Sequence, residues 1–260
     1  MTHSPRVVAI VQARMASTRL SSKVLLDIAI AGRPMLWYVV RRAQRATTVQ
    51  QVVVATSDQP ANDAVANFCI DHAIDCFRGS EDDVLDRYYR AARYFGAGTI
   101  VRITGDCPLI DPEIIDKVVG VYQDGGYDYV SNTLPSTYPD GLDTEVFSVA
   151  ALECAWRDAK WRSEREHVTP YFRKHPKLFR VGNVVCEMDL SDWRWTVDEL
   201  RDLEFVQAVY SQMGDGPFGM VDMLDLLRRH PELAEINAGI GRNEGYHQSV
   251  SKDSLIAREK

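Results

Sequence analysis

The sequence predicts an α/β fold, in which helices cover both faces of a mostly parallel sheet. Strand-like apolar runs alternate with helix-like segments through the first half of the chain, which is the rhythm of βαβ units. Prolines at positions 34, 60 and 112 stand at the expected starts of three helices, where a fixed φ is tolerated. With 260 residues, 45% of them hydrophobic, the chain can form one domain with a substantial core.

The βα units of the first half have clear boundaries. The expected strands span 7–11, 52–56, 74–77 and 99–103. The helices expected after them span 34–45, 61–72, 83–95 and 112–122. Asp58 and Asp111 precede two of these helices and are candidates to cap them.

The rhythm changes from residue 127 onward. Short strands at 128–131 and 144–148 enclose a turn-rich stretch, and a helix from residue 149 and a charged segment follow, so we interpret 128–177 as a small excursion from the main sheet. The sheet resumes at 178–186 and 194–197, before amphipathic helices at 199–212 and 219–230. We therefore expect a single domain over 1–240 and a polar, patternless and mobile tail over 241–260.

Bulk properties exclude several classes of protein. A net charge of -7 and a pI near 5.4 argue against a surface that wraps nucleic acid. The five cysteines form no Cys-x-x-Cys pair, so neither a disulfide framework nor a zinc knuckle is indicated. No apolar run approaches the roughly 20 residues that span a bilayer, and no signal peptide precedes the first strand. We expect a cytoplasmic protein without a membrane partner.

The most informative segment is the cationic loop, residues 13–23, which follows the first expected strand. It carries Arg14, Arg19 and Lys23 together with Ser17. Open α/β sheets bind their ligands beyond the carboxyl ends of their strands, and a polyphosphate would explain this density of cations in an acidic protein. A solvated basic turn is the alternative that charge alone leaves open.

Two aspartates follow other expected strands. Asp106 comes just after the strand at 99–103, at the sheet edge that the cationic loop shares, and Asp198 ends the strand-like run at 194–197. Two carboxylates combined with phosphate oxygens suit Mg²⁺, which takes only one or two protein carboxylates. As alternatives, Asp106 forms a turn and Asp198 caps the helix near residue 199.

Further polar clusters have both a functional and an ordinary interpretation. Arg78, Gly79 and Ser80 precede an acidic helix start, and Gly79 would permit the close approach of a planar base, although helix capping also explains the pattern. Residues 138–145 and 165–171 are dense in polar groups and form a candidate acceptor pocket. Alone, each is an ordinary turn or surface pair.

Common catalytic motifs are absent from the sequence. It contains no Gly-x-Ser-x-Gly elbow, no Gly-x-Gly-x-x-Gly fingerprint and no Gly-x-x-x-x-Gly-Lys-Ser/Thr loop. These absences disfavour a serine hydrolase, a nicotinamide-dependent dehydrogenase and a P-loop kinase.

Taken together, these segments resemble the cytidylyltransferases that make CMP-activated sugars, the CMP-Kdo and CMP-sialic acid synthetases, and most closely the spore coat polysaccharide biosynthesis F-type branch. The resemblance extends to about residue 230 and is carried by Ala13 to Lys23, Arg78-Gly79-Ser80, Thr104 to Pro108, Pro139 to Asp143, Arg165 to Pro170 and Trp195 to Asp198. It implies the Rossmann-like sheet of the nucleotide-diphospho-sugar transferases. Ser21-Ser22 departs from the Pro-Gly that the family usually has before the lysine, while the cations of the loop are kept.

The resemblance also implies roles for individual residues. Arg14, Lys23 and Asp106 would be catalytic, and Asp106 and Asp198 would bind Mg²⁺. The implied nucleotide-binding residues are Ala13, Arg14, Ser17, Arg19, Lys23, Arg78, Gly79, Ser80 and Thr104. The implied acceptor-binding residues are Asn132, Asp140, Asp143, Glu145, Arg165 and His167.

The predicted function is a Mg²⁺-dependent transfer of CMP from CTP to a sugar or sugar-like acid, with release of pyrophosphate, for surface polysaccharide or glycoconjugate biosynthesis. The expected partners are CTP, a small-molecule acceptor and a second copy in a homodimer, with a dimer contact from 128–177. One alternative is a glycosyltransferase that uses a nucleotide sugar, although no Asp-x-Asp pair lies beside Asp106. The second alternative is a nucleotide-binding protein without catalytic activity. The acceptor's identity and the general base stay open.

Overall fold

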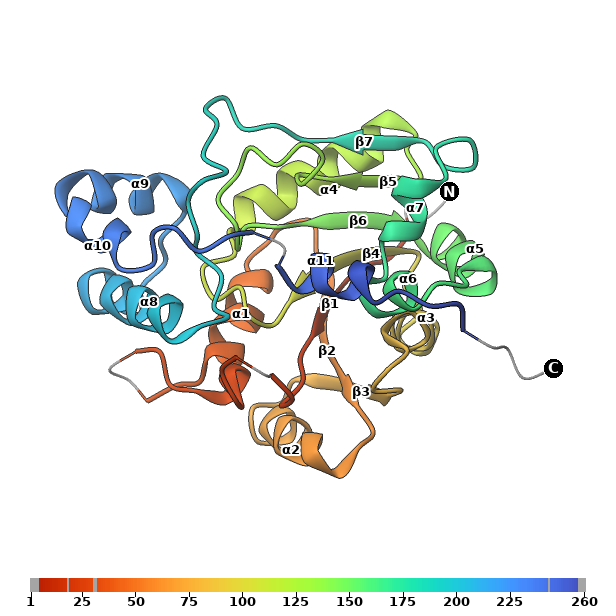
Figure 1. Ribbon diagram of the computed structural model, residues 1–260, viewed down its shortest axis with the longest axis horizontal. Helices are drawn as coiled ribbons and strands as arrows, with labels where there is room; N and C mark the ends of the chain where they lie inside the picture. The colour runs from red at the N-terminus through yellow and green to blue at the C-terminus, as the bar shows by residue number, and fades with distance from the viewer. Residues whose placement is uncertain (1–4, 18, 30–31, 243, 257–260) are drawn as a thin grey trace.

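The computed structural model describes residues 5–17, 19–29, 32–242 and 244–256. Thr18 of the cationic loop, and residues 243 and 257–260 of the expected tail, lie outside these ranges. Figure 1 shows the elements arranged around one central sheet.

Within the described residues, seven strands form one sheet in the order β3-β2-β1-β4-β6-β5-β7. All neighbouring strands are parallel except β6, which runs antiparallel to both β4 and β5. The strands are β1 (Val7–Gln12), β2 (Gln51–Ser57), β3 (Asp75–Gly79), β4 (Thr99–Thr104), β5 (Tyr129–Ser131), β6 (Glu145–Ser148) and β7 (Val181–Asn183). The expected α/β class with a mostly parallel sheet is therefore confirmed.

The alternation of side chains along β1 creates two cores. Val7, Ala9 and Val11 are buried on one face, and Val8 and Ile10 are buried on the other, as period-2 geometry requires. The first face is covered by α1 (Met35–Ala43), α2 (Asp63–Asp71), α4 (Pro112–Gly125), α8 (Leu200–Met213) and α9 (Met220–Arg229). The second face is covered by α3 (Val84–Tyr94), α5 (Val149–Asp158) and α7 (Pro170–Lys174).

Two parts of the predicted sheet are corrected. The stretch 128–177 is less of an excursion than expected, because β5 and β6 pair within the main sheet and only its helices lie outside it. Residues 194–197 form no full strand. Their backbone instead joins two loops, since Trp195 N donates to Asp140 O at 2.6 Å and Val197 N donates to Asp106 O at 2.9 Å.

One of the two predicted helix caps is present. The Asp111 carboxylate accepts a hydrogen bond from Glu113 N at 2.8 Å and caps α4. Asp58 caps no helix. Its backbone N–H donates to Gly79 O at 2.8 Å, while Gln59 and Asn62 precede the short helix η2 (Pro60–Asn62) and α2.

Gly105 allows two loops to meet at the carboxyl edge of the sheet. Its N–H donates to Gln12 O at 2.8 Å, and a Cβ at this position would lie only 2.8 Å from the same oxygen. Glycine therefore permits the chain that follows β4 to run against the end of β1. This contact places Asp106 beside the cationic loop.

The C-terminal segment is not patternless, which corrects the expectation for residues 241–260. It contains α11 (Glu244–Ser251), which contacts α6 (Arg162–His167). Asp253 accepts a 2.6 Å hydrogen bond from Ser163 Oγ, and Leu255 forms a β-bridge with Trp161. Figure 1 shows α11, in dark blue, in front of the sheet and beside α6. Only the short helix α10 (Pro231–Glu235) separates α9 from this segment.

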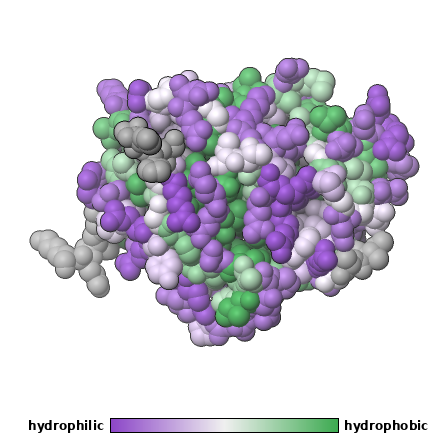
Figure 2. Space-filling model, turned by 180° about the vertical axis from the view of Figure 1, so that it is seen from behind, coloured by the Kyte–Doolittle hydropathy of each residue, from purple (hydrophilic) through white to green (hydrophobic). Residues whose placement is uncertain are grey.

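The described surface and cysteines agree with the bulk composition. Hydrophilic side chains cover most of the face seen in Figure 2, with smaller apolar areas between them. Among the described residues, no helix is long and apolar enough to cross a membrane. The cysteines are all free thiols, as expected, and they are Cys69, Cys76, Cys107, Cys154 and Cys186.

Candidate active site

Lys23 joins two loops at the carboxyl edge of the sheet. It begins the short helix η1 (Lys23–Leu25), and its Nζ donates to Asp106 Oδ2 at 2.8 Å and to Asp198 Oδ1 at 2.6 Å. A third hydrogen bond, at 2.9 Å, goes to Val197 O. The sequence predicted that these three charged residues would face one crevice, and their direct contact confirms this proximity.

The backbone before Lys23 is strained. Ser22 adopts φ 56° and ψ 20°, a left-handed conformation that costs a residue with a Cβ roughly 1 kcal/mol. This is the second position of Ser21-Ser22, where the family usually has glycine. Ser22 therefore adopts a conformation that suits glycine, although it is a serine. It directs the Lys23 side chain toward the two aspartates.

Burial and charge act in opposition on Lys23 and Asp106. Burial lowers the pKa of the Lys23 ammonium, but Asp106 and Asp198 outweigh it, and the net pKa is raised. Burial likewise favours the neutral form of Asp106, yet the Lys23 charge and hydrogen bond lower its pKa to about 2. Both groups are therefore charged at neutral pH.

The other two cations of the loop also face carboxylates. Arg19 lies 3.1 Å from Asp198 Oδ2 and 3.1 Å from Glu244 Oε2. Arg14 lies 3.6 Å from Glu81 and is 45% exposed. Both guanidiniums are thus accessible and carry ion pairs that phosphate oxygens could replace.

Arg194 is a central residue that the sequence analysis missed. Its side chain is 5% exposed and forms ion pairs of 2.9 to 3.0 Å with Asp140, Asp198 and Asp202. The spacing of four and eight residues to Asp198 and Asp202 was no signal in the sequence, because α8 begins only at Leu200 and Arg194 lies outside any helix. Its pairing with Asp140 depends on tertiary structure.

Arg242 was also missed, because it lies in the expected tail. Its guanidinium pairs with Asp143, contacts Asp140 at 3.9 Å and donates to Tyr138 O at 3.0 Å. Burial raises the pKa of Asp143 to about 7 against the opposing charge of Arg242. No local pattern signals this pairing.

The residues expected near the cytosine and ribose lie at the end of β3. Arg78 donates to Ser57 O and Gln59 O, both at 3.1 Å, and so braces the loop after β2. Ser80 Oγ accepts from Asp83 N at 3.0 Å, which is the helix-start role that the sequence also permitted. A Cβ on Gly79 would lie 3.1 Å from the Phe77 ring, so a larger residue here would press on that side chain.

The remaining expected nucleotide-binding residues differ in accessibility. Ala13 is 4% exposed and donates its N–H to Ala55 O at 3.2 Å. The Thr104 hydroxyl lies 3.1 Å from Cys107 Sγ, and Ser17 Oγ accepts from Leu20 N at 3.4 Å.

Two of the expected acceptor residues serve the fold in this structure. Asn132 is fully buried, donates to Leu142 O and accepts from Thr144 N, both at 2.8 Å. Glu145 is buried between Arg102 and Tyr129 Oη. Asp140 is linked to the metal-site candidate Asp198 through Arg194, which pairs with both. Asp143 is linked to Asp140 through Arg242.

The other two expected acceptor residues, Arg165 and His167, lie in the second half of α6. Arg165 joins this helix to α3 through Asp83, at 2.7 Å, rather than turning toward Lys23. His167 Nε2 is buried and has no hydrogen-bond partner among the described residues, and burial lowers the pKa of the ring to about 4. Val168 after it has φ 69° and ψ −55°, and Thr169 N donates to His167 O at 2.8 Å, a γ-turn that is unusual for a β-branched residue.

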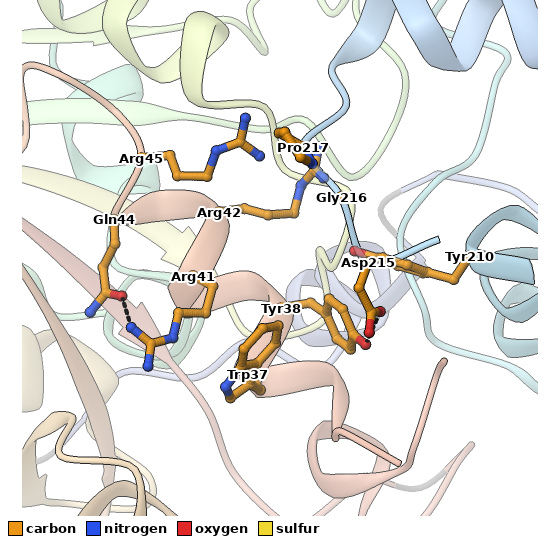
Figure 3. Close-up of a pocket in the computed structure, with 10 residues that line it drawn as sticks. All are labelled: Trp37, Tyr38, Arg41, Arg42, Gln44, Arg45, Tyr210, Asp215, Gly216 and Pro217. Atoms are coloured by element: carbon orange, nitrogen blue, oxygen red, sulfur yellow. Dashed lines mark hydrogen bonds between the residues drawn. The ribbon is translucent and has the colours of Figure 1, made fainter. Parts of the chain in front are cut away.

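A cavity between α1 and the end of α8 lies away from these groups. It measures about 460 Å³ and is lined by α1 and by the turn after α8, as Figure 3 shows. Arg42 and Tyr210 at its wall donate to Ile110 O at 2.7 Å and Pro108 O at 2.9 Å. These residues therefore support the Asp106 loop from behind.

The donor groups at Lys23 fit a divalent cation that shares its ligands with phosphates. Among the described residues, no group of three or more His, Cys, Asp or Glu side chains is arranged to hold a metal by protein ligands alone. Asp106 and Asp198 nevertheless aim their oxygens at one positive charge, the Lys23 ammonium. Two carboxylates completed by phosphate and water oxygens are a usual Mg²⁺ environment.

Comparison with known proteins decides the family. A family model described as cytidylyltransferase matches residues 8–228. The chain belongs to the cytidylyltransferase family. It is a nucleotidyltransferase, as expected, and neither the glycosyltransferase nor the non-catalytic alternative is retained.

Individual relatives agree with this assignment. The spore coat polysaccharide biosynthesis protein SpsF of Bacillus subtilis is 34% identical over 236 residues, which cover 88% of this chain and 96% of that protein. The 3-deoxy-manno-octulosonate cytidylyltransferase of Geobacter sulfurreducens is 40% identical over 113 residues, or 44% of each chain. A cytidylyltransferase structure from Leptospira borgpetersenii covers 92% of this cytidylyltransferase and 100% of that chain, with 30% identity and a TM-score of 0.85.

Proposed function

We propose that this cytidylyltransferase transfers CMP from CTP to a sugar or sugar-like acid, releases pyrophosphate and requires Mg²⁺. The observation that carries the proposal is the convergence of Lys23, Asp106 and Asp198 within 2.8 Å contacts beside the cationic loop. The names of two relatives, one for spore coat polysaccharide biosynthesis and one for 3-deoxy-manno-octulosonate, support a sugar-type acceptor.

In this proposal the cationic loop binds the triphosphate of CTP. An acceptor oxygen must approach a phosphorus atom surrounded by anionic oxygens, so positive charge has to offset that repulsion. Arg14 and Arg19 would exchange their present carboxylate partners, Glu81 and Glu244, for phosphate oxygens. Lys23 would stabilise negative charge on the departing pyrophosphate.

Asp106 and Asp198 would hold the Mg²⁺ ion. When bound, the ion neutralises phosphate charge and stabilises the leaving group. The hydrogen bonds of Lys23 and Arg194 orient the two carboxylates, and Lys23 also lowers the pKa of Asp106. Arg194 also connects Asp198 to Asp140, so the metal side and the acceptor side share one network of charges.

The acceptor would bind beside Asp140 and Asp143, with His167 and Arg165 at the far end. Carboxylates accept hydrogen bonds from hydroxyl groups, and Arg242 balances their charge. The neutral His167 ring offers one unused nitrogen, Nε2. Asn132 and Glu145 would act indirectly, by fixing the loop that carries Asp143 and the strand β6.

Pyrophosphate release tests this function. Purified protein is assayed with CTP, UTP, ATP or GTP against a pool of sugar acids, with Mg²⁺ or with a chelator. We expect release only with CTP, Mg²⁺ and an acceptor, and a loss of at least about 100-fold in Asp106→Asn. The matched control is Asp124→Asn, on the exposed surface of α4, which should keep wild-type turnover. Wild-type turnover in Asp106→Asn would refute the role of Asp106.

We further propose that the protein forms a homodimer, with its contact at the β7 edge of the sheet rather than within 128–177, the stretch expected from the sequence. β7 pairs only with β5 in the described sheet, and Leu178, Val185 and Met188 next to it are 53% to 59% exposed. Light scattering of Val185→Glu should then give a monomer. Val221→Glu, an equally apolar exposed site on α9, should stay dimeric. A wild-type monomer would refute this contact.

A further inference from the structure

Helix α11 lies between the nucleotide side and the acceptor side of the candidate site. At its start, Glu244 Oε2 lies 3.1 Å from Arg19 Nη1 on the cationic loop. Two residues later, the Tyr246 ring meets the His167 ring edge-on, with 5.1 Å between centroids. Ser249 Oγ donates to Glu166 at 3.1 Å. The same helix therefore contacts residues of both sides.

The far end of this segment is fixed to α6. Asp253 accepts hydrogen bonds from Ser163 N at 3.0 Å and from Ser163 Oγ at 2.6 Å. Leu255 forms a β-bridge with Trp161. We name residues 244–256 the C-terminal strap. The strap lies beyond the residues that the family model matches, which end at 228.

Glu244 forms an ion pair with Arg19, a cation that the triphosphate of CTP needs. All the ion pairs of Arg19 in the described structure go to carboxylates, namely Asp198, Glu199 and Glu244. Asp198 and Glu199 belong to the site itself, whereas Glu244 reaches Arg19 from the strap. A guanidinium binds carboxylate and phosphate with the same donors, so Glu244 and a phosphate group compete for it.

We propose that the C-terminal strap couples the two sides of the site. In this proposal, Glu244 holds Arg19 and the strap covers His167 and Glu166 until CTP binds. CTP displaces Glu244 from Arg19, and the strap then loosens from α6 and exposes the acceptor side. By linkage, a docked strap weakens CTP binding, and bound CTP weakens strap docking by the same factor. This inference rests on the proposed function, because it takes CTP as the ligand of Arg19.

Calorimetric titration with CTP and Mg²⁺ tests the first half of this coupling. Glu244→Gln should bind CTP roughly 1.5- to fivefold more tightly than wild type, the factor that a partly exposed ion pair is worth. The matched control is Glu235→Gln on α10, an exposed glutamate for which no ion pair is found among the described residues, and it should leave the affinity unchanged.

A change at the other end of the strap separates coupling from local charge. Asp253→Asn leaves Glu244 in place but weakens the attachment to Ser163. It should also tighten CTP binding, because a strap that docks less firmly competes less. Tighter binding in Glu244→Gln with wild-type affinity in Asp253→Asn would show a local charge effect and overturn the coupling.

Hydrogen exchange tests the second half. In wild-type protein, saturating CTP and Mg²⁺ should speed the exchange of the α11 amides, Glu244–Ser251. Slower exchange, or no change, would overturn the inference. Weaker or equal CTP binding by Glu244→Gln would overturn it as well, while the proposed function would stand. If wild-type protein bound no CTP, the proposed function would fail, and this inference would fail with it.

Discussion

Lys23 Nζ lies 2.6 Å from Asp198 Oδ1, and the same nitrogen donates to Asp106 at 2.8 Å. One buried ammonium thus holds together the ends of two segments that are far apart in the sequence. Removing one partner from a buried set of charges leaves the others uncompensated, which is more costly than losing a surface pair. The contact therefore organises the site before a ligand binds.

We predict that Lys23→Met abolishes most of the activity. The variant loses the cation expected to stabilise the leaving group, and it leaves Asp106 and Asp198 to repel each other. We expect kcat/KM for CTP to fall by about 100- to 1000-fold, as when one preorganised charge is removed. Steady-state pyrophosphate release measures it. Lys177→Met, an exposed lysine, is the control, and a Lys23→Met enzyme as active as this control would contradict the prediction.

The sequence could predict the meeting of Lys23 and Asp106 because of a general rule. Carboxyl ends of parallel strands lie at one edge, so residues just after β1 and β4 must be neighbours. Apolar periodicity, which reports burial against the sheet, located the elements themselves. The proximity that follows from topology was therefore predictable.

Arg242 and α11 could not be predicted in this way. Arg242 pairs with Asp143 across 99 positions, and Glu244 pairs with Arg19 across 225 positions. Such pairs of charges leave no periodic signal in the sequence, and α11 has no buried face to create one. The antiparallel insertion of β6 between β4 and β5 was missed for a similar reason, because strand order depends on long-range pairing.

We predict that Ser22→Gly stabilises the protein. Ser22 has φ 56°, which glycine adopts without the Cβ penalty. The gain should be up to about 1 kcal/mol, reduced by the greater freedom of glycine in the unfolded chain. Urea unfolding measures it. Ser21→Gly is the control, since Ser21 is not among the described residues with positive φ, and it should be neutral or destabilising. If Ser22→Gly lowered the free energy of unfolding, this would contradict a left-handed conformation at Ser22.

We predict that Arg194→Ala destabilises the fold by about 3 to 5 kcal/mol, the cost of unpairing a buried charge. Arg194 is 5% exposed and pairs with Asp202, whose side chain is fully buried. Urea unfolding followed by circular dichroism measures this loss. In the control, Arg180→Ala removes a guanidinium that is 72% exposed and lies 3.7 Å from Asp128, so the expected loss is below about 1 kcal/mol. If the two variants lost the same free energy of unfolding, the buried ion pairs of Arg194 would contribute no more to stability than a surface pair.

We predict that His167 makes the protein sensitive to acid. Burial lowers the pKa of its ring from 6.5 to about 4 in the folded protein, so the unfolded chain binds the proton first as the pH falls. The contribution of His167 to stability therefore decreases as the pH falls from about 6.5 to about 4, and it levels off below that range. His167→Gln cannot take up this proton, so its melting temperature should fall less than that of wild type between pH 7 and pH 4.5. His247→Gln, at an exposed position on α11, should keep the wild-type dependence. If the melting temperatures of wild type and His167→Gln fell equally between pH 7 and pH 4.5, the ring would not be held neutral by burial.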